Sequence, residues 1–127
     1  MSRRALVVDD SRATRALLKR LLVGCDFETA EAGNGIEGLE RLQEIGAVDL
    51  CLVDWNMPQM DGLQFIQEVR KISEYERMIL MMVTSENEPA YIARALKAGA
   101  DEYAMKPLTR EGLLEKLELI GFGVSES

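Results

Sequence analysis

Five polar side chains stand where short apolar segments of this sequence end: Asp9, Asp10, Asp54, Thr84 and Lys106. Carboxylate oxygens are ligands that Mg²⁺ prefers, and a carboxylate can also act as a nucleophile toward phosphorus. Lysine supplies a positive charge for phosphoryl oxygens, and a threonine hydroxyl supplies a hydrogen bond. If folding brings these five residues together, they form a metal-assisted site that accepts a phosphoryl group.

Each of these residues also has a simpler explanation when it is considered alone. Asp10 with Ser11 could cap the helix that follows, and Asp54 could open a polar turn. Thr84 could cap a helix as well, and Lys106 could be a solvated surface charge. These explanations remain open for single residues. For the simpler explanations to account for the whole set, all of them must be true at once for side chains that share one edge of a sheet.

The strands that position these residues are predicted by short, almost continuous apolar runs. Residues 5–8, 50–53 and 78–83 suit strands buried on both faces of a parallel sheet, whereas the more polar residues 27–31 and 102–105 suit edge strands. Between them, the spacing of apolar residues predicts helices near residues 13–22, 36–45, 63–72, 89–98 and 109–117.

Strand and helix therefore alternate five times, which predicts a doubly wound α/β domain. In an open parallel sheet, ligands bind at the carboxyl ends of the strands, where all five polar residues fall. Nothing in the sequence indicates a linker or a second domain. We expect a single domain over residues 1–127, with a core from about 4 to 119 and a short polar C-terminal tail from Gly121 to Ser127.

Composition narrows the possible functions further. The chain has 127 residues, 47% of them hydrophobic, as in an ordinary globular domain. A net charge of −7 argues against nucleic-acid binding, and the absence of histidine removes the usual general base. No apolar run is long enough for a membrane span or a signal peptide, so we expect a cytoplasmic protein. Cys25 and Cys51 lack metal-site spacing and are expected to be buried thiols.

The sequence resembles the receiver domains of response regulators, especially those of chemotaxis. The similarity covers residues 4 to about 119 and is highly specific. It implies a flavodoxin-like five-stranded parallel sheet in the order 2-1-3-4-5, with helices on both faces. The matching motifs are Val7-Val8-Asp9-Asp10-Ser11, Val53-Asp54-Trp55-Asn56-Met57-Pro58, Met60-Asp61-Gly62, Thr84-Ser85, Gly99-Ala100-Asp101-Glu102-Tyr103 and Lys106-Pro107.

The resemblance implies a role for each matching position in the site. Asp54 would be the phosphoacceptor. Asp10, Asp54 and the backbone carbonyl of Asn56 would bind Mg²⁺ directly, while Asp9 would orient a coordinated water. Lys106 would pair with the phosphoryl group, and the peptide bond that follows it would be cis.

The resemblance also implies a conformational switch. Thr84 would move toward the phosphoryl oxygens while Tyr103 turns from exposed to buried, which would remodel the surface formed by the fourth helix, fifth strand and fifth helix. Asn56 and Glu86 would flank the phosphoryl group and accompany rapid self-dephosphorylation. Glu86 could instead be an acid in the first turn of the fourth helix. Ser85 departs from the alanine common in this branch, which could slow the switch or alter access to the site.

The function that follows is that of a switch rather than a metabolic enzyme. We expect a stand-alone monomeric regulator that is phosphorylated by a chemotaxis-type histidine kinase and then binds the flagellar motor switch protein; a phosphorelay intermediate is the alternative. No membrane or nucleic-acid partner is expected. An aspartyl-nucleophile phosphatase would need an Asp-x-Asp motif after the first strand. A flavin-binding module would need a hydroxyl- or glycine-rich loop there.

Overall fold

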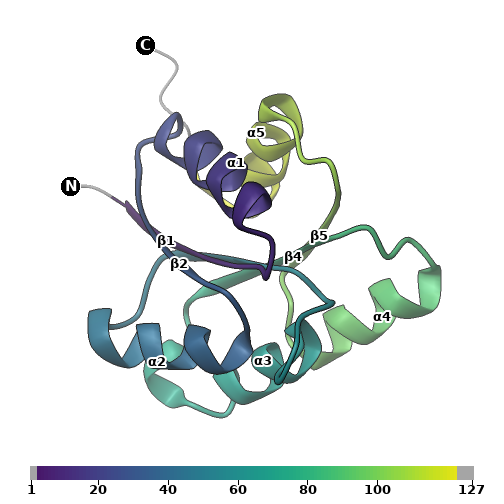
Figure 1. Ribbon diagram of the computed structural model, residues 1–127. Coiled ribbons are helices and arrows are strands. Elements are labelled where there is room, and N and C mark those ends of the chain that lie inside the picture. Colours follow the sequence, from purple (N-terminus) through teal and green to yellow (C-terminus); the bar gives the residue numbers. More distant parts are fainter. Residues whose placement is uncertain (1–2, 123–127) are drawn as a thin grey trace.

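Five parallel strands form one sheet in the order β2-β1-β3-β4-β5, and the helices pack on its two faces (Figure 1). This computed structural model describes residues 3–122, so most of the predicted polar tail lies outside the described residues. The strands are β1 (Arg3–Val8), β2 (Phe27–Ala32), β3 (Leu50–Val53), β4 (Ile79–Thr84) and β5 (Glu102–Met105). The helices are α1 (Arg12–Val23), α2 (Gly35–Ile45), α3 (Gly62–Val69), α4 (Pro89–Ala98) and α5 (Arg110–Leu119), with a short 3₁₀ turn, η1 (Ser73–Tyr75).

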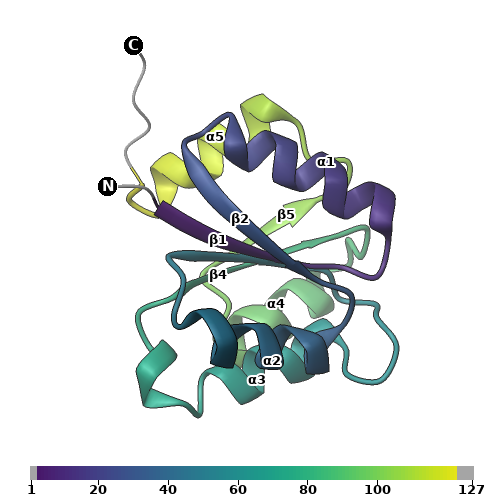
Figure 2. The same cartoon turned by 60° about the vertical axis from the view of Figure 1, so that its left-hand side comes forward.

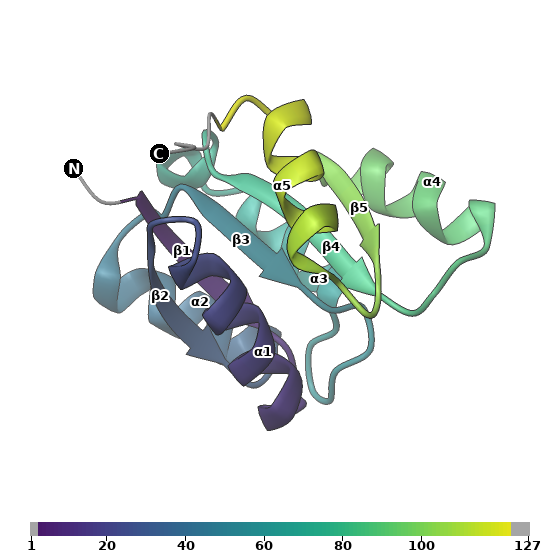
Figure 3. The same cartoon turned by 90° about the horizontal axis from the view of Figure 1, so that it is seen from above.

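The helices form two layers on either side of the sheet. Helices α1 and α5 cover one face, and α2, α3 and α4 cover the other (Figures 1 and 2). Alternate residues of the central strands supply the two cores: Val7 packs on the side of α1 and α5, and Val8 packs on the opposite side. Both faces are thus buried, which explains the unbroken apolar runs. Viewed from above, the strands lie side by side with β2 and β5 at the two edges, as predicted (Figure 3).

The apolar stripes predicted for the helices are narrower in the structure. In α1, Leu18 and Leu22 are buried one above the other, four residues apart. Four residues that we expected on buried faces are 38–46% exposed, because they lie at the border of a stripe or beyond the helix end: Leu17, Ile36, Ile72 and Leu96. Strand β4 begins at Ile79, one residue later than predicted. No helix within residues 3–122 combines the length and the apolar character that a membrane crossing requires.

The first residues of α1 and α4 show whether the residues before them act as helix caps. Ser11 is the N-cap of α1, and its hydroxyl accepts a hydrogen bond from the N–H of Thr14 at 3.2 Å. Helix α4 begins at Pro89, and its N-cap Glu88 forms no side-chain cap. Thr84 lies at the end of β4 and does not cap α4. Its position therefore needs a different reason.

The edge strand β2 is attached to α1 by a charged cluster. Glu31 accepts hydrogen bonds from Lys19 and Arg15, and both are ion pairs. The hydrogen bond from Lys19, and to a smaller extent that from Arg15, holds the pKa of the Glu31 carboxyl below its usual value. These ion pairs lie outside the two cores. Because they need an ionised Glu31, they stabilise the fold less as the pH falls into the acid range.

Candidate functional site

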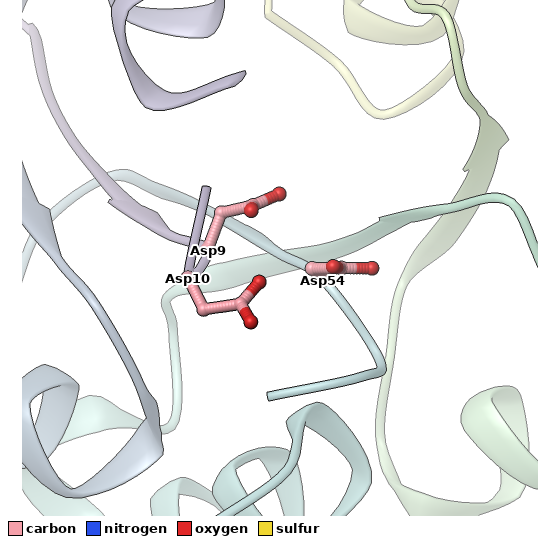
Figure 4. A group of neighbouring side chains, drawn as sticks. All are labelled: Asp9, Asp10 and Asp54. Atoms are coloured by element: carbon pink, nitrogen blue, oxygen red, sulfur yellow. The ribbon is translucent and has the colours of Figure 1, made fainter. Parts of the chain in front are cut away.

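Three carboxylates converge at the carboxyl edge of the sheet. Strands β1 and β3 are neighbours, with Val8 paired with Val53, so Asp9 and Asp54 leave the sheet side by side. Oxygen atoms of Asp9, Asp10 and Asp54 all lie within 4.8 Å of one another (Figure 4). Asp9 and Asp54 are 1% and 7% exposed, whereas Asp10 is open to solvent. The structure confirms the prediction that these three side chains lie close together.

Lys106 reaches the same carboxylates from the end of the edge strand β5. It follows β5, and its Nζ donates a hydrogen bond to Oδ2 of Asp9 at 2.8 Å. The same Nζ lies 3.1 Å from Oδ2 of Asp54. The Lys106 side chain is only 24% exposed, so it is not a solvated surface charge. The Lys106–Pro107 peptide bond is cis, as the resemblance implied.

Burial and charge oppose each other in this cluster. Burial raises the pKa of Asp54 above its usual value, and the negative charge of Asp9 raises it further, while Lys106 acts in the opposite direction. Burial alone would lower the pKa of Lys106, but its hydrogen bond to Asp9 and the charge of Asp54 outweigh burial and raise it. Lys106 is therefore a stable cation. One cation among three carboxylates leaves the site attractive to a further positive ion.

The backbone around Asp54 is tightly held. The N–H of Asp54 donates to the carbonyl of Val8 at 2.9 Å, and Oδ1 of Asp54 accepts the N–H of Trp55 at 2.8 Å. The N–H of Gly62 donates to the carbonyl of Trp55 at 2.8 Å. A Cβ atom at Gly62 would lie 2.1 Å from the carbonyl oxygen of Asp54, so no larger residue fits without movement. Gly62 lies in the Met60-Asp61-Gly62 motif, but nothing in that sequence pattern predicts this positioning role.

The loop between β4 and α4 closes the site on another side. Thr84 is fully buried, and its hydroxyl accepts the N–H of Glu86 at 3.4 Å. The amide of Asn56 donates to the Glu86 carboxylate at 3.3 Å. Glu86 precedes the first residue of α4 by three positions, so the interpretation of Glu86 as a first-turn acid is wrong.

Tyr103 of β5 is hydrogen-bonded to this loop. The residue is 7% exposed, and its hydroxyl donates to the backbone carbonyl of Glu86 at 2.7 Å. Burial raises the pKa of the Tyr103 hydroxyl above its usual value, so it remains a donor at neutral pH. Tyr103 is buried in this structure, which contains no phosphoryl group, and its turn from exposed to buried stays a prediction.

The donor set fits a hard divalent cation. Carboxylate oxygens on two adjacent strand ends are the ligands that Mg²⁺ and similar ions use, and the exposed Asp10 leaves an open approach from solvent. Within residues 3–122, this is the only group of three or more acidic or thiol side chains that close together. Both cysteines are buried and free, and Cys51 lies in β3 away from the cluster, as expected.

Comparisons with known proteins agree with this geometry. A family model described as the response regulator receiver domain matches residues 5–118. A chemotaxis protein CheY homolog of Campylobacter jejuni is 42% identical over 124 residues, which is 95% of each chain. The chemotaxis protein CheY1 of Helicobacter pylori is 39% identical over 116 residues, or 91% of this chain and 94% of that one.

Solved structures point the same way. The chemotaxis protein CheY4 of Vibrio cholerae superposes with a TM-score of 0.88 at 31% identity, covering 94% of this chain and 99% of that one. A CheY-like receiver domain protein of Methanospirillum hungatei gives a TM-score of 0.84 at 32% identity, covering 94% of both chains. The phosphatase and flavin-binding alternatives gain no support from these matches. The chain belongs to the response regulator receiver domain family, and within it the chain is CheY-like.

Proposed function

We propose that this chain is a chemotaxis response regulator that signals through phosphorylation of Asp54. The observation that carries the proposal is the arrangement in which Lys106 bridges the buried carboxylates of Asp9 and Asp54, with Asp10 beside them. The similarity to proteins named for chemotaxis supports the pathway. The protein acts as a monomeric cytoplasmic switch and turns over no separate metabolic substrate.

Asp10, Asp54 and the backbone carbonyl of Asn56 hold Mg²⁺ in this proposal, and Asp9 orients a coordinated water. The bound ion supplies the positive charge that lets an anionic phosphoryl group approach three carboxylates. Asp9 suits an indirect role because it is the most deeply buried of the three carboxylates; its Oδ1 accepts the N–H of Ser11 at 2.9 Å and its Oδ2 accepts a hydrogen bond from Lys106. Both of its oxygens are thus already engaged by the protein.

The proposed reaction moves a phosphoryl group from a phosphohistidine of the kinase to Asp54. A carboxylate oxygen of Asp54 forms the new P–O bond as the P–N bond breaks, and the histidine nitrogen keeps the electron pair and takes up a proton from water. Lys106 and the Thr84 hydroxyl bind the phosphoryl oxygens. Hydrolysis by water later releases inorganic phosphate. Asn56 and Glu86, which are hydrogen-bonded to each other, tune that step.

The switch follows from the hydrogen bonds of the β4–α4 loop. Movement of the Thr84 hydroxyl toward a phosphoryl oxygen would release the N–H of Glu86, while Tyr103 holds the carbonyl of the same residue. Phosphorylation would therefore shift the population of loop conformations and change the surface of α4, β5 and α5. That surface binds the flagellar motor switch protein in this proposal.

Fluorescence of Trp55 tests the proposal, because Trp55 is the only tryptophan and adjoins Asp54. We expect Mg²⁺ to change the emission and acetyl phosphate to change it again only when Mg²⁺ is present. Asp54→Asn should abolish the second change. Phosphorylated protein should then retain flagellar switch protein in a pull-down. Transfer to a histidine-containing phosphotransfer protein, without such retention, would favour the phosphorelay alternative.

A further inference from the structure

A cation and two aromatic rings form a stack beside the phosphoacceptor. The Trp55 ring packs edge-on against Tyr91 of α4, with ring centroids 5.0 Å apart and planes at 86°. The guanidinium carbon of Arg94 lies 5.3 Å from the centroid of Trp55 and 5.8 Å from that of Tyr91. Tyr91 and Arg94 are three residues apart, so they project from one side of the helix. Trp55, Tyr91 and Arg94 are called the aromatic stack below.

The rings are the only partners that Arg94 has in the described part of the chain. Arg94 is exposed and forms none of the ion pairs or side-chain hydrogen bonds found within residues 3–122. No carboxylate therefore competes with the rings for the guanidinium. Trp55 in contrast is only 5% exposed with the guanidinium of Arg94 over its ring.

The aromatic stack is connected to the reacting carboxylate through the backbone of Trp55. The N–H of Trp55 donates to Oδ1 of Asp54, which leaves Oδ2 facing Lys106. The carbonyl of Trp55 is held by Gly62. The ring in the aromatic stack and the N–H that orients Asp54 therefore belong to the same residue. Tyr91 and Arg94 of α4 supply the contacts of the stack with the ring.

We infer that Arg94 is a positioning residue for phosphoryl transfer to Asp54, acting through the ring of Trp55. The inference rests on the proposed function of Asp54. With the guanidinium over the ring, α4 and the phosphoacceptor loop move as one unit, so that Oδ1 stays on the Trp55 N–H and Oδ2 stays beside Lys106. Without it, the loop samples orientations in which neither oxygen is held, and the fraction of molecules ready to react falls.

The test compares rates of phosphorylation by acetyl phosphate at saturating Mg²⁺ in wild type, Arg94→Ala, Arg94→Lys and Lys97→Ala. The Asp54 oxygen forms the P–O bond and acetate leaves with the electron pair of the bond that breaks. Lys97 is the matched control, because it lines the same groove between α3 and α4 as Arg94 and contacts neither ring. The strength of exposed cation–π contacts predicts a rate about two- to fivefold lower for Arg94→Ala. Arg94→Lys keeps a cation and should lose less, and Lys97→Ala should react as wild type does.

Two further readouts separate positioning from general stability. Trp55 in Arg94→Ala should become more accessible to quenching by acrylamide, and circular dichroism should show a folded protein at the assay temperature. An unchanged phosphorylation rate in Arg94→Ala overturns the inference. Equal slowing in Arg94→Ala and Lys97→Ala also overturns it, because that result reports charge steering of an anionic donor. A wild type that is never phosphorylated overturns the proposed function and this inference with it.

Discussion

Replacing Lys106 with methionine removes the cation that bridges two buried carboxylates. Methionine has a similar length and can occupy the same space without charge. In the wild type, Nζ of Lys106 lies 2.8 Å from Oδ2 of Asp9 and 3.1 Å from Oδ2 of Asp54. The variant retains every carboxylate and leaves them facing one another. Its stability should therefore depend strongly on whether another cation is present.

The size of the effect follows from the spacing of the charges. Two like charges 4.8 Å apart, the upper limit for the closest oxygens of this cluster, repel by roughly 3.5 kcal/mol at an effective dielectric constant of about 20. Breaking a buried ion pair by removing one partner costs about 3–5 kcal/mol. Because Lys106 is 24% exposed, we expect the lower end, a loss of about 3 kcal/mol in the free energy of unfolding without Mg²⁺.

Urea denaturation in EDTA and in saturating Mg²⁺ measures this loss. Without Lys106 as a competitor, the carboxylates should bind Mg²⁺ about tenfold more tightly, and each tenfold gain in affinity restores about 1.4 kcal/mol. Lys116→Met is the control, since Lys116 pairs with the partly exposed Glu102 at 3.1 Å. That variant should lose about 1 kcal/mol or less, whatever the Mg²⁺ concentration. Equal losses in the two variants, or a loss in Lys106→Met that Mg²⁺ does not reduce, would refute the reasoning.

Three further predictions concern other parts of the fold. Gly62→Ala should lower the Tm and slow phosphorylation, because its Cβ would meet the Asp54 carbonyl at 2.1 Å; Gly24→Ala, with a φ of −65° and ordinary contacts, should be neutral in both assays. Glu31→Gln should lose about 0.5 kcal/mol in the free energy of unfolding at pH 7, because a carboxyl whose pKa is lowered in the folded state stabilises the fold at pH values above its unfolded pKa. That deficit should shrink as the pH falls below the unfolded pKa of about 4.3, and it should vanish only below the lowered pKa of the folded state, where both states of the wild type are protonated. Tyr103→Phe should lose about 1 kcal/mol in urea denaturation through the missing bond to a loop carbonyl, and an unchanged midpoint would contradict the bond's role.

The fold could be predicted because its layers are encoded in local patterns. The unbroken apolar run of β3 can be satisfied only by a strand with both faces covered, and the structure covers both. The helix boundaries were less accessible to prediction. Ile72 continues the apolar spacing of α3, yet α3 ends at Val69 because the chain turns into η1. The period of a helix does not show where the chain leaves it.

The site was predictable where residues sit on strands and less so where they sit on loops. Parallel strands end at the same edge, so the meeting of Asp9, Asp54 and Lys106 follows from topology alone. The partners of Glu86 depend on the path of the β4–α4 loop, which no pattern in the sequence specifies. The contact of Arg94 with Trp55 likewise depends on how α4 packs, since a helical arginine without an acidic neighbour resembles any solvated charge.

The most direct measurement of the central claim is the mass of the intact protein after incubation with acetyl phosphate. The account predicts the addition of one phosphoryl group only when Mg²⁺ is present, lost on treatment with hydroxylamine as expected for an acyl phosphate. Peptide mapping after borohydride reduction should place the modification at Asp54, and Asp54→Asn should remain unmodified. A wild-type protein that gains no mass in Mg²⁺, or gains it equally in EDTA or in Asp54→Asn, would contradict the account.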